Sequence, residues 1–177
     1  MQYRRARMAG GSYFFTVNLL DRRQTWLVDY VDVLRERVRI VKRHHPFHID
    51  AMVIMPDHVH AIWTLPEGDA DFSTRWGLIK AGFSKALPAQ ENVTRSRAGK
   101  GERGIWQRRF WEHVIRDDDD YARHVDNIHF NPVKHGYVTR PVDWAYSSIH
   151  RWIEQGWMPA DWAAAVEMES DFGERAG

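Results

Sequence analysis

Two histidines separated by one residue, His58 and His60, are the sharpest chemical signal in the sequence. They open an alternating apolar stretch at 58–65, typical of a β-strand, directly after a Pro-Asp turn. Side chains two apart on a strand point to one face, so both imidazoles project together while Val59 faces away. Two neutral imidazoles on one face can bind a divalent metal if a third ligand comes from elsewhere. Such pairs are also common as packing residues, and the position after the turn favours the ligand interpretation.

A second group of polar residues lies in and just after the segment 118–130, which is predicted to be a helix that ends at Asn131 and Pro132. The amide oxygen of Asn131 is an adequate ligand for a hard cation, although Asn before Pro is also a routine helix terminator. Asn127 precedes Asn131 by one helical turn and shares its face. A nucleophile for attack on phosphorus near Asn131 is therefore expected at position 127, but an amide is not a useful nucleophile. Tyr121 lies about 120° round the helix from position 127 and is interpreted as packing.

Length and composition describe the framework that must position these residues. The chain has 177 residues, which favours one domain, and it is 44% hydrophobic and 28% charged, as expected for a packed core. It has no cysteine, which excludes a disulfide framework, a thiolate metal site and a cysteine nucleophile. No apolar run approaches the roughly 18 residues of a membrane span, and the first fifteen residues lack the apolar core of a signal peptide. We therefore expect a cytoplasmic protein.

The order of predicted elements indicates the fold. Strands are predicted at 12–20, 47–55 and 58–65, and helices at about 29–44, 71–87 and 118–130. The two strands around the Pro-Asp turn should form an antiparallel hairpin, and 105–115 is either a short strand or an irregular aromatic segment. The order β-α-β-β-α-β predicts an α+β ferredoxin-like α/β sandwich, with an antiparallel sheet and helices on one face. The domain should cover 1–140, with 141–177 as a C-terminal tail packed on or near it.

Charge is distributed unevenly along the chain. Residues 1–50 carry ten Lys/Arg against five Asp/Glu and residues 95–116 carry seven against two, whereas residues 117–177 carry five against twelve. Basic segments of this kind favour a polyanion such as nucleic acid, although the segments could equally neutralise each other within the molecule. The candidates for binding DNA phosphates or guanine edges are Arg4, Arg5, Arg7, Arg95, Arg97, Lys100, Arg103, Arg108 and Arg109. Four nearby aromatic residues could stack on bases, although core packing is the more common use: Phe14, Phe15, Trp106 and Trp111.

Several longer motifs make the sequence similar to a known family. They are GGSYFFTVNL (10–19), MPDHVHAIWTLPEG (55–68), WQRRFWEH (106–113), HFNPVKHG (129–136) and DWAYSS (143–148). Together they resemble the REP-associated tyrosine transposases, a bacterial branch of the single-tyrosine HUH transposases, over about positions 3 to 162. The resemblance implies the ferredoxin-like HUH endonuclease fold. It also implies a monomeric, Mg²⁺- or Mn²⁺-dependent nuclease that cuts and rejoins single-stranded DNA through a 5′-phosphotyrosine intermediate.

The same resemblance implies roles for particular residues. His58 and His60 match the metal-binding histidine pair, and Asn131 matches the third metal ligand. The family's helix motif reads Tyr-Ile-X-X-Asn-Pro-Val-Lys-His-Gly, and this chain has Asn127 where the catalytic tyrosine belongs. Asn127 is therefore either an engineered substitution or a natural one, and the chain is expected to be cleavage-deficient. The expected DNA is a REP element, a short palindrome that folds as a hairpin with a tetranucleotide at its 5′ side.

Two other functions remain open at this point. The first is a domesticated protein that binds DNA hairpins without chemistry. The second is a phosphodiesterase in which His58, His60 and Asn131 hold a metal that activates water.

Overall fold

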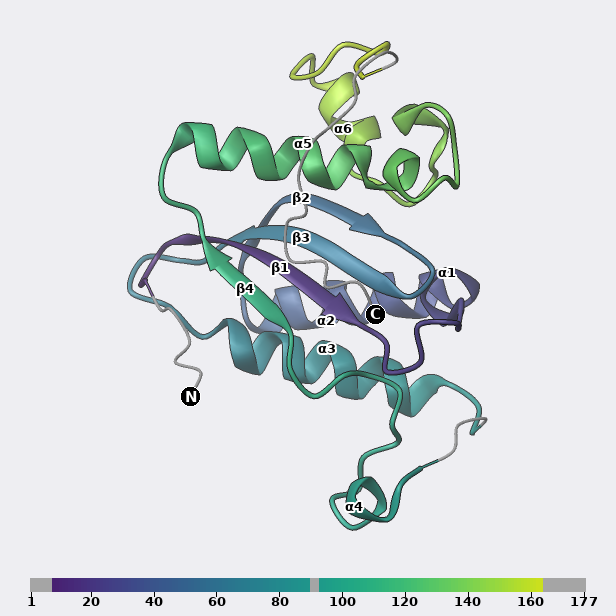
Figure 1. Ribbon diagram of the computed structural model, residues 1–177. Helices are drawn as coiled ribbons and strands as arrows, with labels where there is room; N and C mark the ends of the chain where they lie inside the picture. Colours follow the sequence, from purple (N-terminus) through teal and green to yellow (C-terminus); the bar gives the residue numbers. More distant parts are fainter. Residues whose placement is uncertain (1–7, 90–92, 164–177) are drawn as a thin grey trace.

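Four antiparallel strands form the centre of the molecule in the computed structural model, which describes residues 8–89 and 93–163 (Figure 1). The strands are β1 (Ser12–Asn18), β2 (His48–Ile54), β3 (His58–Thr64) and β4 (Trp111–Val114). Their order in the sheet is β2-β3-β1-β4, and all neighbouring pairs are antiparallel. This is the ferredoxin-like sheet that the sequence predicts, with β2 and β3 joined as the expected hairpin. The ambiguous segment 105–115 contains the short edge strand β4.

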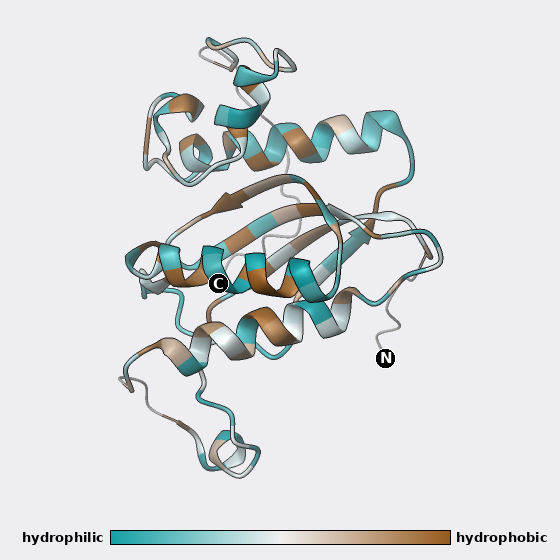
Figure 2. Cartoon of the chain, turned by 180° about the vertical axis from the view of Figure 1, so that it is seen from behind, coloured by the Kyte–Doolittle hydropathy of each residue, from teal (hydrophilic) through white to brown (hydrophobic). Residues whose placement is uncertain are grey.

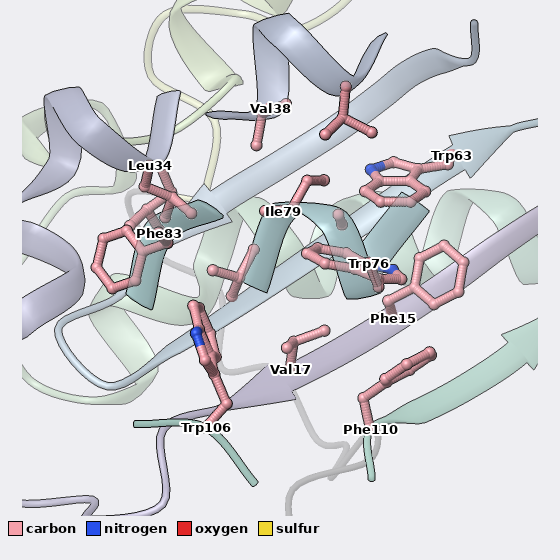
Figure 3. Close-up of a cluster of buried hydrophobic side chains, with 14 of the residues drawn as sticks. Phe15, Val17, Leu34, Val38, Trp63, Trp76, Ile79, Phe83, Trp106 and Phe110 are labelled. Atoms are coloured by element: carbon pink, nitrogen blue, oxygen red, sulfur yellow. The ribbon is translucent and has the colours of Figure 1, made fainter. Parts of the chain in front are cut away.

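The helices α2 (Val31–His44) and α3 (Phe72–Ala86) cover one face of the sheet (Figure 1). Their hydrophobic residues alternate with hydrophilic ones along each helix, as expected for helices with one buried side (Figure 2). Asp71 caps α3 by accepting a hydrogen bond from the Thr74 backbone N–H at 3.0 Å. Between these helices and the sheet lies the larger core, shown in part in Figure 3. It includes Phe15, Val17 and Trp63 from the strands, Leu34 and Val38 from α2, and Trp76, Ile79 and Phe83 from α3.

The helix α5 (Asp118–Lys134) covers the opposite face, over β2 and β3 (Figure 1). The expectation of helices on one face was therefore wrong for this element, since Val125 and Ile128 of α5 pack against Ile62 in a second core. The predicted helix end at Asn131 was also wrong. Pro132 lies inside the last turn, where the missing N–H removes one hydrogen bond, and the helix continues because His135 N–H still donates to the Asn131 carbonyl at 3.0 Å.

The remaining described elements are short. They are α1 (Trp26–Asp29), α4 (Arg95–Ala98), the 3₁₀ helix η1 (Pro141–Asp143) and α6 (Ile149–Glu154). No helix within the described ranges is long and apolar enough to cross a membrane. The division into a domain at 1–140 and a tail at 141–177 stays a prediction, although Ile149 of α6 is buried in the second core.

The segment 144–152 closes the outer edge of β2. Ser147 forms a β-bridge with Val53, and the backbone N–H groups of Ile54 and Ser148 donate to Tyr146 and Met52 carbonyls. Side chains also donate hydrogen bonds to backbone carbonyls of β2. The Trp144 indole N–H donates to Ile54 O, and the side chains of Arg151 and Trp152 donate to Asp50 O. The edge of β4 has no such cover among the described residues.

Candidate metal and DNA site

His58 and His60 lie on β3 and point to the face that α5 covers. Their cross-strand partners on β1 are Asn18 and Thr16, which alternate with Val17 of the larger core. Val59, between the two histidines, packs into that core on the other face. The centres of the two imidazole rings are 4.8 Å apart, and both side chains are buried. The strand therefore brings the pair together as the period of two predicts.

Asn131 meets this pair from α5. Its amide oxygen lies 3.2 Å from Nε2 of His58, and its side chain is fully buried. An amide oxygen and an imidazole nitrogen at this separation, beside a second imidazole, form a donor set suited to a divalent cation. The residues His58, His60 and Asn131 are thus gathered in one place, although they come from two elements far apart in sequence.

The other ring nitrogen of each histidine is held by an oxygen. Nδ1 of His58 is 2.8 Å from a carboxylate oxygen of Asp57, and Nδ1 of His60 is 2.9 Å from the Thr16 hydroxyl. If each Nδ1 carries the proton, each Nε2 keeps its lone pair for a ligand. Arg22 also contacts the Asp57 carboxylate through its guanidinium Nε.

The electrostatics of Asp57 fit this role. Burial raises the pKa of the Asp57 carboxyl, but the hydrogen bond and charge of His58, together with those of Arg22, outweigh it and hold the pKa at about 2. Asp57 is therefore ionised at neutral pH, and the negative charge stabilises the orientation of the His58 ring.

Sequence reasoning missed three residues of this site. Asp57 was interpreted only as part of a turn, yet its place next to the first histidine was a usable signal. Thr16 could be found only from the strand register, which sets it opposite His60. His135, at the C-terminal end of α5, has its ring centre 5.2 Å from that of His58, and only the fold brings it there.

Asn127 lies one turn before Asn131 on α5 and is only 4% exposed. The side-chain amide of Asn127 makes no hydrogen bond with any residue in the described ranges. Tyr121, on the same helix, donates a hydrogen bond to Asp50 at 3.0 Å, and burial and the Asp50 charge raise its pKa. Tyr121 packs beside the second core, which fits its interpretation as a packing residue.

A separate cluster near the start of α5 consists of His113, Asp120 and His124, whose ligand atoms lie within 4.8 Å of one another and could hold a metal ion. Asp120 is already well bound, since His113 Nε2 lies 2.8 Å from its carboxylate and Arg116 donates through both backbone and side chain. Burial raises the pKa of Asp120, but the hydrogen bonds of Arg116 and His113 reverse this and lower it strongly. The contact between His113 and Asp120 joins β4 to α5.

The basic residues of 95–109 that are candidates for DNA binding differ in how far protein groups already engage their side chains. Arg103 donates to the carbonyls of Ser84, Leu87 and Pro88 and so anchors this segment to the end of α3. Arg97 and Arg108 share Glu102, at 3.2 and 3.1 Å. A cavity of about 650 Å³ lies between α3 and residues 101–108. Three members of the group form no ion pair with any residue that the structure describes: Arg95, Lys100 and Arg109. Arg4, Arg5 and Arg7 lie outside the described residues.

A ferredoxin-like sheet that presents a His-X-His pair to a helix is the arrangement of the HUH endonuclease class. No protein-family model matches the chain. A curated relative, the REP-associated tyrosine transposase of Escherichia coli K12, is 48% identical over 165 residues, which cover 93% of this chain and 92% of the relative. A relative from Haemophilus influenzae is 44% identical over 168 residues, 94% of this chain and 96% of the relative. The chain belongs to the REP-associated tyrosine transposases.

A solved structure agrees with this assignment. It is described as a REP-associated tyrosine transposase bound to a REP hairpin, and it superposes on this chain with a TM-score of 0.84 at 46% identity. The match covers 99% of this chain and 98% of the other. The whole α+β fold is therefore that of the family.

Proposed function

We propose that this chain binds REP hairpin DNA through the face of the sheet that carries His58 and His60. The observation that carries the proposal is the 3.2 Å approach of the Asn131 amide oxygen to His58 Nε2 beside the His60 ring. Family membership supports the choice of DNA, because the superposed relative is described as bound to a REP hairpin. The protein would act in the cytoplasm, associated with the nucleoid, and it would act as a monomer.

The three polar residues fit a divalent cation, for which Mg²⁺ and Mn²⁺ are the candidates. When bound, such an ion supplies Lewis-acid stabilisation of charge on a phosphate. The chain's own residues prepare the place for it: Asp57 and Thr16 fix the two imidazole rings, and α5 sets the Asn131 oxygen against them. The burial of all three side chains excludes bulk water, which strengthens electrostatic interactions there.

We propose further that Asn127 occupies the place of the nucleophile, so that the chain binds hairpin DNA without cutting it. The resemblance to the family helix motif places the catalytic tyrosine at 127. Helix geometry supports the assignment, since residues four apart share a face and Asn131 reaches the histidines from that face. A phenol at 127 would attack phosphorus, leave a 3′-hydroxyl and become attached to the 5′ phosphate, whereas an amide forms no such ester.

Tyr121 does not replace the missing nucleophile. Its phenol is bound to Asp50, and its raised pKa makes the phenolate harder to form. The alternative function is therefore a domesticated protein that recognises hairpins and performs no chemistry, which Asn127 itself favours.

DNA recognition would use the basic residues of both segments. Arg95, Lys100 and Arg109 are the most available, and Arg4, Arg5 and Arg7 are proposed to join them. Arg97, Arg103 and Arg108 also remain candidates, although each already contacts protein groups. Arginine forks suit phosphates and guanine edges, so these contacts would supply both affinity and orientation.

A covalent-trapping experiment tests the proposal. A 5′-tailed, labelled REP strand is incubated with Mn²⁺ and either the chain as it stands or the Asn127→Tyr variant, and products are resolved on denaturing gels. We expect binding but no cleavage with Asn127, and cleavage with protein attached to a DNA 5′ end after Asn127→Tyr. Adding Tyr121→Phe to that variant should not remove the adduct.

The outcomes separate the functions. Cleavage by the chain as it stands would refute the inactive-site proposal, and a free 5′-phosphate product would indicate a water-using phosphodiesterase. Binding with no adduct even after Asn127→Tyr would favour the non-catalytic hairpin-binding protein.

A further inference from the structure

Trp111, the first residue of β4, is an unusually exposed aromatic residue on the sheet. Its exposed fraction is 43%, whereas Phe14, Phe15 and Trp106 are buried. Those three pack in the two cores, so they are not available to bases. Of the four aromatic residues considered for stacking, Trp111 alone presents a ring to solvent.

The strand register places Trp111 beside the histidine pair. Thr16 of β1 lies opposite His60 on one side and opposite Trp111 on the other. Residues directly opposite on neighbouring strands point to the same face, so His60, Thr16 and Trp111 form one row across the sheet. Each step across the row is about 5 Å between Cα atoms, so Trp111 stands about 10 Å from His60. The Thr16 side chain between them is small and is turned to His60 Nδ1 at 2.9 Å.

The indole of Trp111 has no aromatic partner and no hydrogen bond among the residues that the structure describes. Trp157 provides the comparison, because it is 60% exposed but its ring centre lies 5.4 Å from that of Trp152. Tryptophan usually places its large apolar ring in a core or an interface. The exposed ring of Trp111 is therefore available to an interface.

A charge near Trp111 in the sequence indicates the kind of partner. Arg109 is exposed two residues earlier and forms no ion pair within the described ranges. An exposed indole with an exposed arginine two residues away along the chain matches a nucleotide, in which a flat base and an anionic phosphate lie together. The basic balance of residues 95–116, with seven Lys/Arg against two Asp/Glu, favours a polyanionic partner of this kind.

We propose that Trp111 stacks on an unpaired base of single-stranded DNA next to the histidine centre, with Arg109 on a neighbouring phosphate. This inference rests on the proposed function, because it names the contact that holds the unpaired 5′ nucleotides of the hairpin. Trp111 would position the strand, so that one of its phosphates lies at His58 and His60. It would not discriminate strongly between bases, because every base has a face to stack.

Two labelled DNAs test the inference with the full chain: a REP hairpin carrying the 5′ tetranucleotide, and the same hairpin without it. Trp111→Ala should weaken binding of the tailed hairpin at least about fivefold, the low end for loss of one base–aromatic stack. Binding of the tail-less hairpin should change less than about twofold. Trp111→Phe should keep most of the affinity, because a smaller ring still stacks.

Trp157→Ala is the matched control, because it removes another exposed indole away from the row, and it should affect neither DNA. Equal binding of the tailed hairpin by Trp111→Ala and the unchanged chain would overturn the inference while leaving the proposed function intact. The inference would also fail if Trp111→Ala weakened both DNAs equally, or if sedimentation showed that it only dissociates pairs of chains. No binding of either DNA by the unchanged chain would refute the proposed function as well.

Discussion

The amide oxygen of Asn131 lies 3.2 Å from Nε2 of His58, although 73 residues separate them in the chain. The contact exists because α5 continues through Pro132, which keeps Asn131 inside the helix and directed at β3. A helix that ended at Asn131 would leave its side chain free to rotate away. The geometry of the centre therefore depends on the length of α5 as much as on the histidines themselves.

Asp57→Asn should weaken Mn²⁺ binding by about 10- to 100-fold without unfolding the chain, because the His58 ring loses its charged partner. Isothermal titration calorimetry with the metal alone measures this. Asp69→Asn is the matched control, since Asp69 also pairs with an arginine, Arg75, at 2.7 Å but far from the histidines. His58→Ala or His60→Ala should abolish binding at this centre. Unchanged affinity in Asp57→Asn would show that Asp57 is only a turn residue.

Asp120→Ala should destabilise the fold by roughly 1–3 kcal/mol, because His113 of β4 and the Arg116 backbone N–H lose their shared acceptor. The free energy of unfolding in urea measures the loss. Asp118→Ala, at an exposed position of the same helix turn, should cost much less. If both substitutions cost the same, the cluster of His113, Asp120 and His124 does not fasten the helix.

Hairpin affinity should fall steeply with salt, because each phosphate contact contributes a slope of about −0.7 to −0.9 in log K against log[salt]. Arg109→Ala should make this slope less steep by about 0.7 to 0.9, which is the contribution of one phosphate contact. Joint replacement of Arg4, Arg5 and Arg7 should reduce it further. Arg39→Ala is the control, because Arg39 pairs with Glu36 on the outer side of α2 and should leave the slope unchanged. An unchanged slope after Arg109→Ala would remove that residue from the phosphates.

Acidification should destabilise the chain through His129. Burial lowers the pKa of His129 to about 3, and the charges of Arg151 and His150 add to the effect. An unfolded histidine titrates near pH 6.5, so below that pH the unfolded chain takes up a proton that the folded chain refuses until about pH 3. The stabilising contribution is therefore complete above pH 6.5 and is lost as the pH falls from 6.5 towards 3, by up to roughly 4 kcal/mol.

Urea denaturation at several pH values measures this dependence. His129→Gln should flatten the curve between pH 6.5 and 4, and His44→Gln, at an exposed position, should not. An equally steep curve in His129→Gln would assign the acid sensitivity to other groups.

Much of the fold could be predicted because its signals are local. The hairpin of β2 and β3 follows from two alternating stretches around one turn, and α3 follows from its apolar face and the Asp71 cap. The position of α5 could not be predicted in this way. An amphipathic helix shows which of its sides is buried but not which face of a sheet will bury it, and Pro132 gave a misleading end signal.

For the site, the sequence allows a prediction only of the candidate metal ligands. His58, His60 and Asn131 stand out by spacing and by resemblance, because the residue types themselves have metal-binding chemistry. Thr16 and His135 have no such signal, since a threonine in a strand and a histidine at a helix end serve many purposes. Their contribution arises from strand register and helix length, which are tertiary properties.

The closed outer edge of β2 also limits how copies of this chain can associate through their sheets. Residues 144–152 already occupy that edge, so β4 is the remaining open edge of the described sheet. Strand addition through β4 would join two molecules symmetrically and consume the open edge of both. A fibre needs two open edges on every molecule, so sheet-to-sheet association of this chain would stop at a closed pair.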